Sequence, residues 1–191
     1  MYLDVPFKEI KSNLDITALQ EAVLKATEED WYANIFRKEQ GGLTGEQVET
    51  ILFNLNGAGT PEGIAQNPSK TFFWEDTWDK WKDLVEPIVK EAISGYDNHE
   101  NAFVNKCLIP RMRPGTTIPE HIDLSSVFNV SHRIHIPLVT NPDVYFMIDG
   151  ERCIMEEGNA YEINNKVMHS VENKGSETRI HLLFDIYIPK K

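Results

Sequence analysis

The segment 178–188, TRIHLLFDIYI, decides the expected fold because apolar and polar side chains alternate along it. Successive side chains of a β-strand point to opposite faces, so this pattern predicts a strand with one wholly apolar face. The segment 131–139, SHRIHIPLV, alternates in the same sense. We therefore expect two strands that pack their apolar faces on another layer. Their other faces carry an arginine and, two residues later, a histidine: Arg133 with His135, and Arg179 with His181.

The region between these two segments contains only short apolar runs separated by turn residues. These runs are 144–148, 152–155, 158–163 and 166–171. The dipeptide Asp149-Gly150 separates the first two, and Asp-Gly between apolar runs is typical of a β-hairpin. Short strands without intervening helices indicate an antiparallel sandwich or jelly roll. We place this core at residues 105–190.

The first hundred residues show helical spacing instead. Apolar side chains recur at helical intervals within 15–26 and 44–55, and a tryptophan-rich stripe at 74–88 predicts a helix that packs on a sheet. The segment 56–70 is rich in Gly, Pro and Asn, which predicts a long loop that could act as a lid. The expected architecture is a single domain, 1–191, that is mainly β with N-terminal helices. Residues 1–100 form its helical buttress.

Composition and charge exclude several functional classes. The chain has 191 residues, with 19 Lys and Arg against 30 Asp and Glu, for a net charge of −11. This charge argues against nucleic acid as a partner, because such binding depends on neutralising phosphates. No apolar run reaches the ~18 residues of a membrane span, and the N-terminus resembles no signal peptide. Since two cysteines make no disulfide framework, we expect a cytoplasmic protein without a membrane anchor.

Three residues have the spacing of a metal site. His121 and Asp123 form a His-x-Asp pair, and His169 follows 48 residues after His121. Two histidines and one carboxylate are the facial triad of non-haem Fe(II) oxygenases, which leaves open positions on the metal. Arg179, 10 residues beyond His169, would carry a guanidinium near the metal, and its planar fork suits a carboxylate. The same ligands could also hold Zn or Mn.

With these motifs the sequence resembles the aspartyl/asparaginyl β-hydroxylase family. The resemblance covers about residues 105–190 and rests on the following motifs: Arg113-Pro114-Gly115, His121-x-Asp123, HRIHIPL at 132–138, Gly158, HSVEN at 169–173 and RIHLLFD at 179–185. The family consists of Fe(II)- and 2-oxoglutarate-dependent dioxygenases built on a double-stranded β-helix, the jelly roll.

The resemblance assigns expected roles to six residues. His121, Asp123 and His169 would bind Fe(II). Arg179 would hold the distal carboxylate of 2-oxoglutarate, and Arg133 and His135 would hold its end next to the iron. Two departures stand out. The animal protein-modifying members have Gly where this chain has Asp123, and Pro110 replaces a serine that assists the distal carboxylate.

The resemblance implies a dioxygenase that uses Fe(II), 2-oxoglutarate and O₂ to hydroxylate an unactivated C–H bond, releasing succinate and CO₂. The expected substrate is an amino acid of Asp, Asn or Pro type, free or within a peptide. Two alternatives remain open, because a fold does not determine a function. One is a non-catalytic cupin-like module that binds a metal or carboxylate; the complete triad with Asp123 disfavours it. The other is a Zn or Mn cupin enzyme; Arg179 disfavours it.

Overall fold

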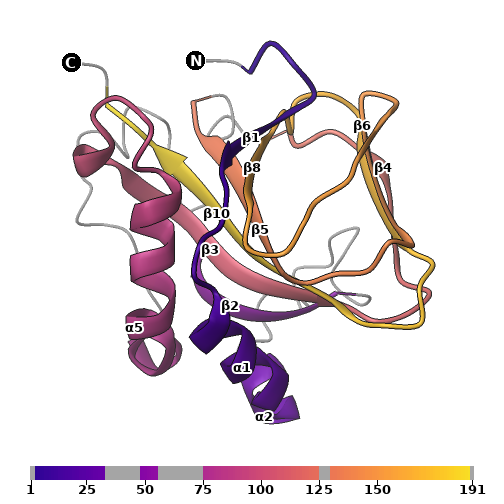
Figure 1. Cartoon of the computed structure of the whole chain (residues 1–191), viewed down its shortest axis with the longest axis horizontal. Coiled ribbons are helices and arrows are strands. Elements are labelled where there is room, and N and C mark those ends of the chain that lie inside the picture. Colours follow the sequence, from indigo (N-terminus) through magenta and orange to yellow (C-terminus); the bar gives the residue numbers. More distant parts are fainter. Residues whose placement is uncertain (1–2, 33–47, 56–74, 125–129, 190–191) are drawn as a thin grey trace.

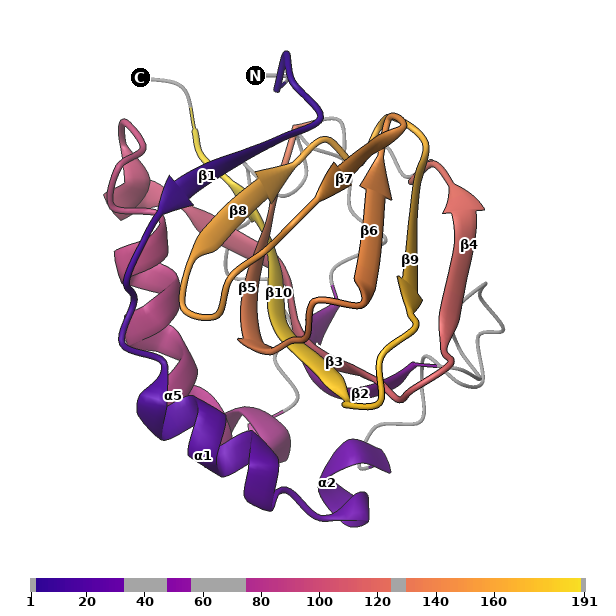
Figure 2. The same ribbon diagram turned by 45° about the vertical axis from the view of Figure 1, so that its right-hand side comes forward.

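The computed structural model describes residues 3–32, 48–55, 75–124 and 130–189. Two antiparallel sheets face each other (Figures 1 and 2). The larger sheet has the order β1 (Phe7–Lys11), β8 (Ala160–Ile163), β5 (His132–Val139), β10 (Arg179–Tyr187), β3 (Phe103–Met112) and β2 (Glu49–Leu55). The smaller sheet has the order β4 (Thr117–His121), β9 (His169–Asn173), β6 (Val144–Ile148) and β7 (Glu151–Cys153). The predicted jelly-roll class is confirmed.

The helices cover the side of the larger sheet that faces away from the smaller one (Figure 1). They are α1 (Thr17–Lys25), α2 (Glu28–Tyr32) and α5 (Glu75–Ala92), followed by a short 3₁₀ turn at His99–Asn101. The stripe predicted to pack on the sheet does so: Trp81, Val85 and Ile88 of α5 are buried in the main apolar core. No helix of the described chain is both long and apolar enough to cross a membrane.

The alternation predicted for β5 and β10 separates an apolar layer from a polar interior. The even-numbered side chains of both strands, such as Ile134 and Phe184, lie in the core shared with the helices. The opposite face carries the buried Arg133, His135 and Arg179, which point between the two sheets. The predicted hairpin is also present, since Asp149 and Gly150 connect β6 to β7 with positive φ angles.

The helix predicted over 44–55 is wrong for the described residues 48–55, which form strand β2. This strand pairs with β3, and Ile51, Leu52 and Phe53 are all at most 1% exposed. A strand buried on both faces is a continuous apolar run, and periodicity cannot distinguish such a run from a buried helix. The first hundred residues therefore contribute β1 and β2 to the larger sheet as well as helices. The loop predicted at 56–70 lies outside the described residues.

Candidate metal centre

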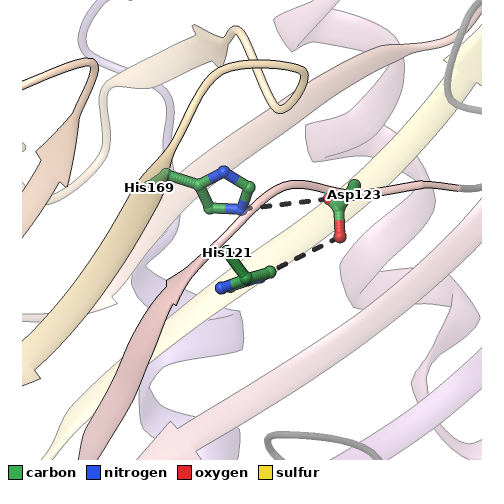
Figure 3. A group of neighbouring side chains, drawn as sticks. All are labelled: His121, Asp123 and His169. Atoms are coloured by element: carbon green, nitrogen blue, oxygen red, sulfur yellow. Dashed lines mark ion pairs between the residues drawn. The ribbon is translucent and has the colours of Figure 1, made fainter.

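Strands β4 and β9 bring the three predicted ligands together. β4 ends at His121, whose partner in the ladder is His169, and their ring centroids lie 4.3 Å apart. Asp123 follows two residues after the end of the strand. Its carboxylate lies 4.0 Å from Nε2 of each histidine, and the candidate ligand atoms all lie within 4.8 Å of one another (Figure 3). This arrangement is compact enough for a single metal ion.

Backbone carbonyls fix the orientation of both imidazoles. Nδ1 of His121 lies 2.8 Å from the carbonyl oxygen of Pro119, and Nδ1 of His169 lies 2.9 Å from that of Val167. A carbonyl can only accept a hydrogen bond, so each Nδ1 donates and each Nε2 keeps its lone pair. Burial lowers the pKa of His169, which keeps its ring neutral. Each histidine can therefore offer its Nε2 to a metal.

The carboxylate of Asp123 is ionised and braced on one side. Burial raises its pKa, but the positive charge of Arg133, aided by Lys106, outweighs burial and leaves the pKa below its ordinary value. Oδ2 of Asp123 accepts hydrogen bonds from Nη1 of Arg133 and, at 3.3 Å, from the side-chain amide of Asn165. The backbone N–H of Asp123 also donates to the carbonyl of Asn165. The ligand is therefore fixed before any metal binds.

Arg133 joins two carboxylates. Its Nε and Nη2 donate to the two oxygens of Asp185, each at 2.7 Å, while Nη1 bonds Asp123. Arg133 and Asp185 stand opposite each other in the β5–β10 ladder, so their side chains share the inner face. Burial lowers the pKa of Arg133, but the two carboxylates more than offset this and hold the pKa above its ordinary value.

Arg179 lies in a different environment. It is 2% exposed, and its guanidinium contacts the sulfur of Met112 at 3.4 Å, Nδ1 of His181 at 3.1 Å and the ring of Phe146, whose centroid lies 5.7 Å from Cζ. Its Nε is buried without a partner among the described residues, and no described carboxylate lies within salt-bridge distance. Burial lowers the pKa of Arg179 to about 9. An uncompensated buried cation is unfavourable on its own and becomes favourable when an anion binds beside it.

His135 is the second site residue with an unsatisfied atom. Its side chain is 5% exposed, and Nδ1 has no hydrogen-bond partner within the described parts of the chain. Burial, followed by the charges of Arg179 and Arg133, holds its pKa well below the ordinary value, so the ring is neutral. It contacts Phe146 and His181 edge-on. His135 can therefore donate one hydrogen bond to a ligand.

All six predicted site residues line one cavity of about 310 Å³ between the two sheets. Its remaining walls are mostly apolar and include the following side chains: Val48, Leu108, Pro110, Met112, Ile118, Phe146, Ile163, Val171 and Leu183. Pro110 is part of this wall, and the polar group next to Arg179 is His181.

Sequence reasoning missed part of the centre. Lys106, which lines the cavity, and Asn165, which bonds Asp123, were not among the candidates. The alternation in 178–188 puts Asp185 on the same face as Arg179, but Asp185 pairs with Arg133 instead. Only the register of β5 against β10 identifies this partner.

Comparisons with known proteins give one family and a set of similar folds. The sequence model described as aspartyl/asparaginyl beta-hydroxylase matches residues 70–189, which is more than half of the chain. Comparison with curated protein sequences returns no significant match.

Several solved structures share the fold at low sequence identity. An oxidoreductase of the 2OG-Fe(II) oxygenase family from Burkholderia pseudomallei matches with a TM-score of 0.55 and 14% identity, over 76% of this chain and 70% of that chain. The nickel complex of the non-haem monooxygenase ThoJ matches with a TM-score of 0.57 and 14% identity, over 97% of this chain and 74% of that chain. A prolyl-4-hydroxylase from Pseudomonas putida matches with a TM-score of 0.50 and 12% identity, over 98% of this chain and 95% of that chain.

Proposed function

The chain belongs to the aspartyl/asparaginyl beta-hydroxylase family of Fe(II)- and 2-oxoglutarate-dependent oxygenases, and we propose that it hydroxylates an amino acid, free or within a peptide. The proposed reaction replaces an unactivated C–H bond by C–OH and releases succinate and CO₂. One observation carries the proposal. A compact set of metal ligands, His121, Asp123 and His169, shares its cavity with Arg179, a buried cation without a described carboxylate partner.

The ligand set fits divalent iron. Two neutral imidazoles and one ionised carboxylate are the donors of the facial triad, which leaves positions for a co-substrate and O₂. When bound, iron and 2-oxoglutarate supply the oxidising chemistry of the reaction. The protein then has to hold the ligands, orient the target and exclude water. In this chain the backbone carbonyls behind His121 and His169 and the bracing of Asp123 perform the first task.

The other polar groups of the cavity fit a dicarboxylate. Arg179 would hold the carboxylate of 2-oxoglutarate that lies farthest from the metal, because the guanidinium has an unused buried donor. His135 would donate to the end nearer the metal. The prediction that Arg133 also holds that end stays a prediction, since the three donor contacts described for Arg133 go to Asp185 and Asp123.

The remaining wall of the cavity is suited to excluding water. Leu108, Phe146 and Val171 line it, and its volume of about 310 Å³ is at the lower end of small-molecule sites, which span roughly 300–1,000 Å³. A site of this size suits a compact co-substrate together with one side chain of a substrate. This supports a substrate of amino-acid size at the reacting position, whether free or part of a peptide.

The first experiment needs no substrate. Purified protein is mixed with Fe(II) and 2-oxoglutarate without oxygen, and the visible spectrum is recorded. We expect a weak charge-transfer band that is lost in His169→Ala and that needs at least tenfold more 2-oxoglutarate in Arg179→Ala. His132→Ala serves as the control, because His132 bonds Glu162 on the outer face of the sheet and should keep the band. Iron bound at the triad without a band would contradict the proposal.

A second experiment addresses the substrate. A panel of free amino acids and short peptides is assayed for succinate release above the uncoupled rate, with Asp, Asn and Pro compounds included. We expect stimulation by at least one member of this class and a product that is 16 mass units heavier. Stimulation restricted to compounds without an amino-acid unit would refute the substrate class and leave the oxygenase assignment intact.

A further inference from the structure

Asp185 is a buried carboxylate that the proposed reaction does not use. It lies on β10, is 1% exposed, and does not belong to the group of candidate metal ligands. Both of its oxygens accept hydrogen bonds from the guanidinium of Arg133, at 2.7 Å each. This is the bidentate geometry that fixes a guanidinium in one orientation.

The orientation of Arg133 determines how it meets Asp123. Asp185 occupies Nε and Nη2, and Arg133 turns Nη1 toward Oδ2 of Asp123. Asn165 also donates to Oδ2, whereas no hydrogen bond to Oδ1 is found among the described residues. Oδ1 lies 4.0 Å from Nε2 of His121, and Oδ2 lies 4.0 Å from Nε2 of His169. The oxygen that faces His169 is therefore braced, and the oxygen that faces His121 stays free to bind a metal.

Removing Asp185 would disturb this arrangement in two ways. The freed Nε and Nη2 edge of Arg133 could bind both oxygens of Asp123 as a fork, in direct competition with a metal ion. In addition, Arg133 would keep a positive charge that Asp185 now balances, next to a site for a divalent cation. Both effects weaken metal binding, but the added positive charge does not disfavour an anionic co-substrate.

We propose that Asp185 is a positioning residue of the metal centre: by holding Arg133 in one orientation, it keeps one oxygen of Asp123 available and offsets a positive charge beside the metal. This inference rests on the proposed function, because it requires that His121, Asp123 and His169 bind the metal. It assigns Asp185 no contact with the metal, the co-substrate or the substrate.

The test measures metal affinity directly. Metal-free protein is titrated with Co(II), and binding is followed by the visible absorption of the ion. We expect Asp185→Asn to bind Co(II) about 10–100-fold more weakly than wild type, the range typical for residues that support metal ligands. At saturating Co(II), its affinity for 2-oxoglutarate should stay within threefold of wild type or increase. A merely structural role would weaken both affinities or only lower the melting temperature.

Glu162→Gln is the matched control. Glu162 is also a buried carboxylate of the larger sheet, 7% exposed, and it accepts hydrogen bonds from Tyr96 and His132 outside the cavity. This variant should lose stability and keep its Co(II) affinity. Arg133→Lys provides a second test, because lysine retains the positive charge beside Asp185 but cannot bind both oxygens of Asp123 as a fork. In the Arg133→Lys background we expect Asp185→Asn to lose less Co(II) affinity than it does in the wild-type background.

The outcomes separate the two proposals. If wild type does not bind Co(II), or if His121→Ala binds Co(II) as well as wild type does, the proposed metal centre itself is refuted. If wild type binds Co(II) at this centre but Asp185→Asn binds it equally well, or if Asp185→Asn loses as much affinity in the Arg133→Lys background as in wild type, the role of Asp185 is refuted. The role is also refuted if Glu162→Gln loses as much Co(II) affinity as Asp185→Asn, or if Asp185→Asn loses affinity for metal and co-substrate alike.

Discussion

Replacing Arg179 by methionine should make the metal-free protein more stable, although it removes the residue proposed to hold the co-substrate. Arg179 is a buried cation that contacts a sulfur atom, an imidazole nitrogen and the ring of Phe146, and no described carboxylate. Methionine has a similar length, fits among the apolar side chains of Met112 and Phe146, and carries no charge to desolvate. The substitution therefore trades an unfavourable buried charge for apolar packing.

The magnitude follows from the pKa of Arg179. Burial lowers it from 12.5 to about 9, and one pKa unit corresponds to about 1.4 kcal/mol, which gives an upper limit of about 5 kcal/mol. Relaxation and water entry reduce this penalty, and replacing buried ionic groups by apolar ones stabilises proteins by about 1–4 kcal/mol. We expect a gain of about 1–3 kcal/mol. A cation whose pKa is lowered by folding destabilises the folded state fully below that pKa, so the gain should be complete at pH 7 and fade above about pH 9.

Thermal unfolding followed by circular dichroism measures the effect. For a chain of this size, 1 kcal/mol shifts the melting temperature by about 2–4 °C, so Arg179→Met should melt roughly 2–12 °C higher than wild type. Addition of Mn(II) and 2-oxoglutarate should stabilise wild type beyond the effect of Mn(II) alone, and the variant should lack this increment.

Arg133→Met is the opposing control. It leaves Asp185 buried without its guanidinium, and breaking a buried ion pair in this way costs about 3–5 kcal/mol. The two arginine variants should therefore move the melting temperature in opposite directions. A drop of several degrees in Arg179→Met would mean that Arg179 stabilises the empty fold, and the argument for an uncompensated cation would be wrong.

Three further predictions concern stability. Tyr96→Phe removes a 2.6 Å hydrogen bond to the buried carboxylate of Glu162 and should cost about 1.5–3 kcal/mol in urea unfolding at pH 7. Burial opposes ionisation of Glu162, but hydrogen bonds keep its pKa below 4.5. The stability lost in Tyr96→Phe should therefore become smaller as the pH falls below 4.5, because the hydrogen bond favours the ionised carboxylate. An equal loss of stability at pH 7 and at low pH would contradict this prediction. Gly158→Ala should cost about 1–3 kcal/mol, because Gly158 has a φ of +76° and a backbone oxygen would lie 3.1 Å from the added Cβ. Gly150→Ala should cost less, because no atom lies within 4 Å of its added Cβ. The reverse order of the two costs would refute the steric argument. Mn(II) should raise the melting temperature of wild type but not of His169→Ala, and equal shifts would place the metal elsewhere.

The sequence predicted those strands that have one apolar and one polar face. β5 and β10 alternate because the helices cover one side and the cavity lies on the other, so Arg133, His135 and Arg179 could be assigned to a common interior. The same holds for the end of β4, where His-x-Asp leaves room for two residues to turn toward one point. Such patterns reflect local backbone geometry and are readable without a structure.

Two of the strands that were missed, β2 and β3, lack this contrast between faces. β2 is buried on both sides, so its side chains Ile51, Leu52 and Phe53 show no alternation. β3 lies between β10 and β2 and was not predicted as an element; it contains Pro110, which normally argues against a central strand because it lacks an N–H donor. The partner of Arg133 was equally hidden, since it depends on strand register and not on the sequence of either strand.

The two buried arginines also explain how the centre can accept a metal ion and a dianion together. Among the described residues, the charged groups that line or brace the cavity are three cations and two aspartates: Lys106, Arg133, Arg179, Asp123 and Asp185. Their formal charges leave one positive charge in the empty protein. A divalent cation alone would raise this to three positive charges, and 2-oxoglutarate alone would change it to one negative charge, whereas both together restore the original balance. Because unbalanced charge is costly in a buried site, each should bind more tightly when the other is present. The two arginines contribute differently to this coupling between the metal ion and the co-substrate. Arg133 is neutralised by its own carboxylates near the metal, and Arg179 is left without one where the anion would lie.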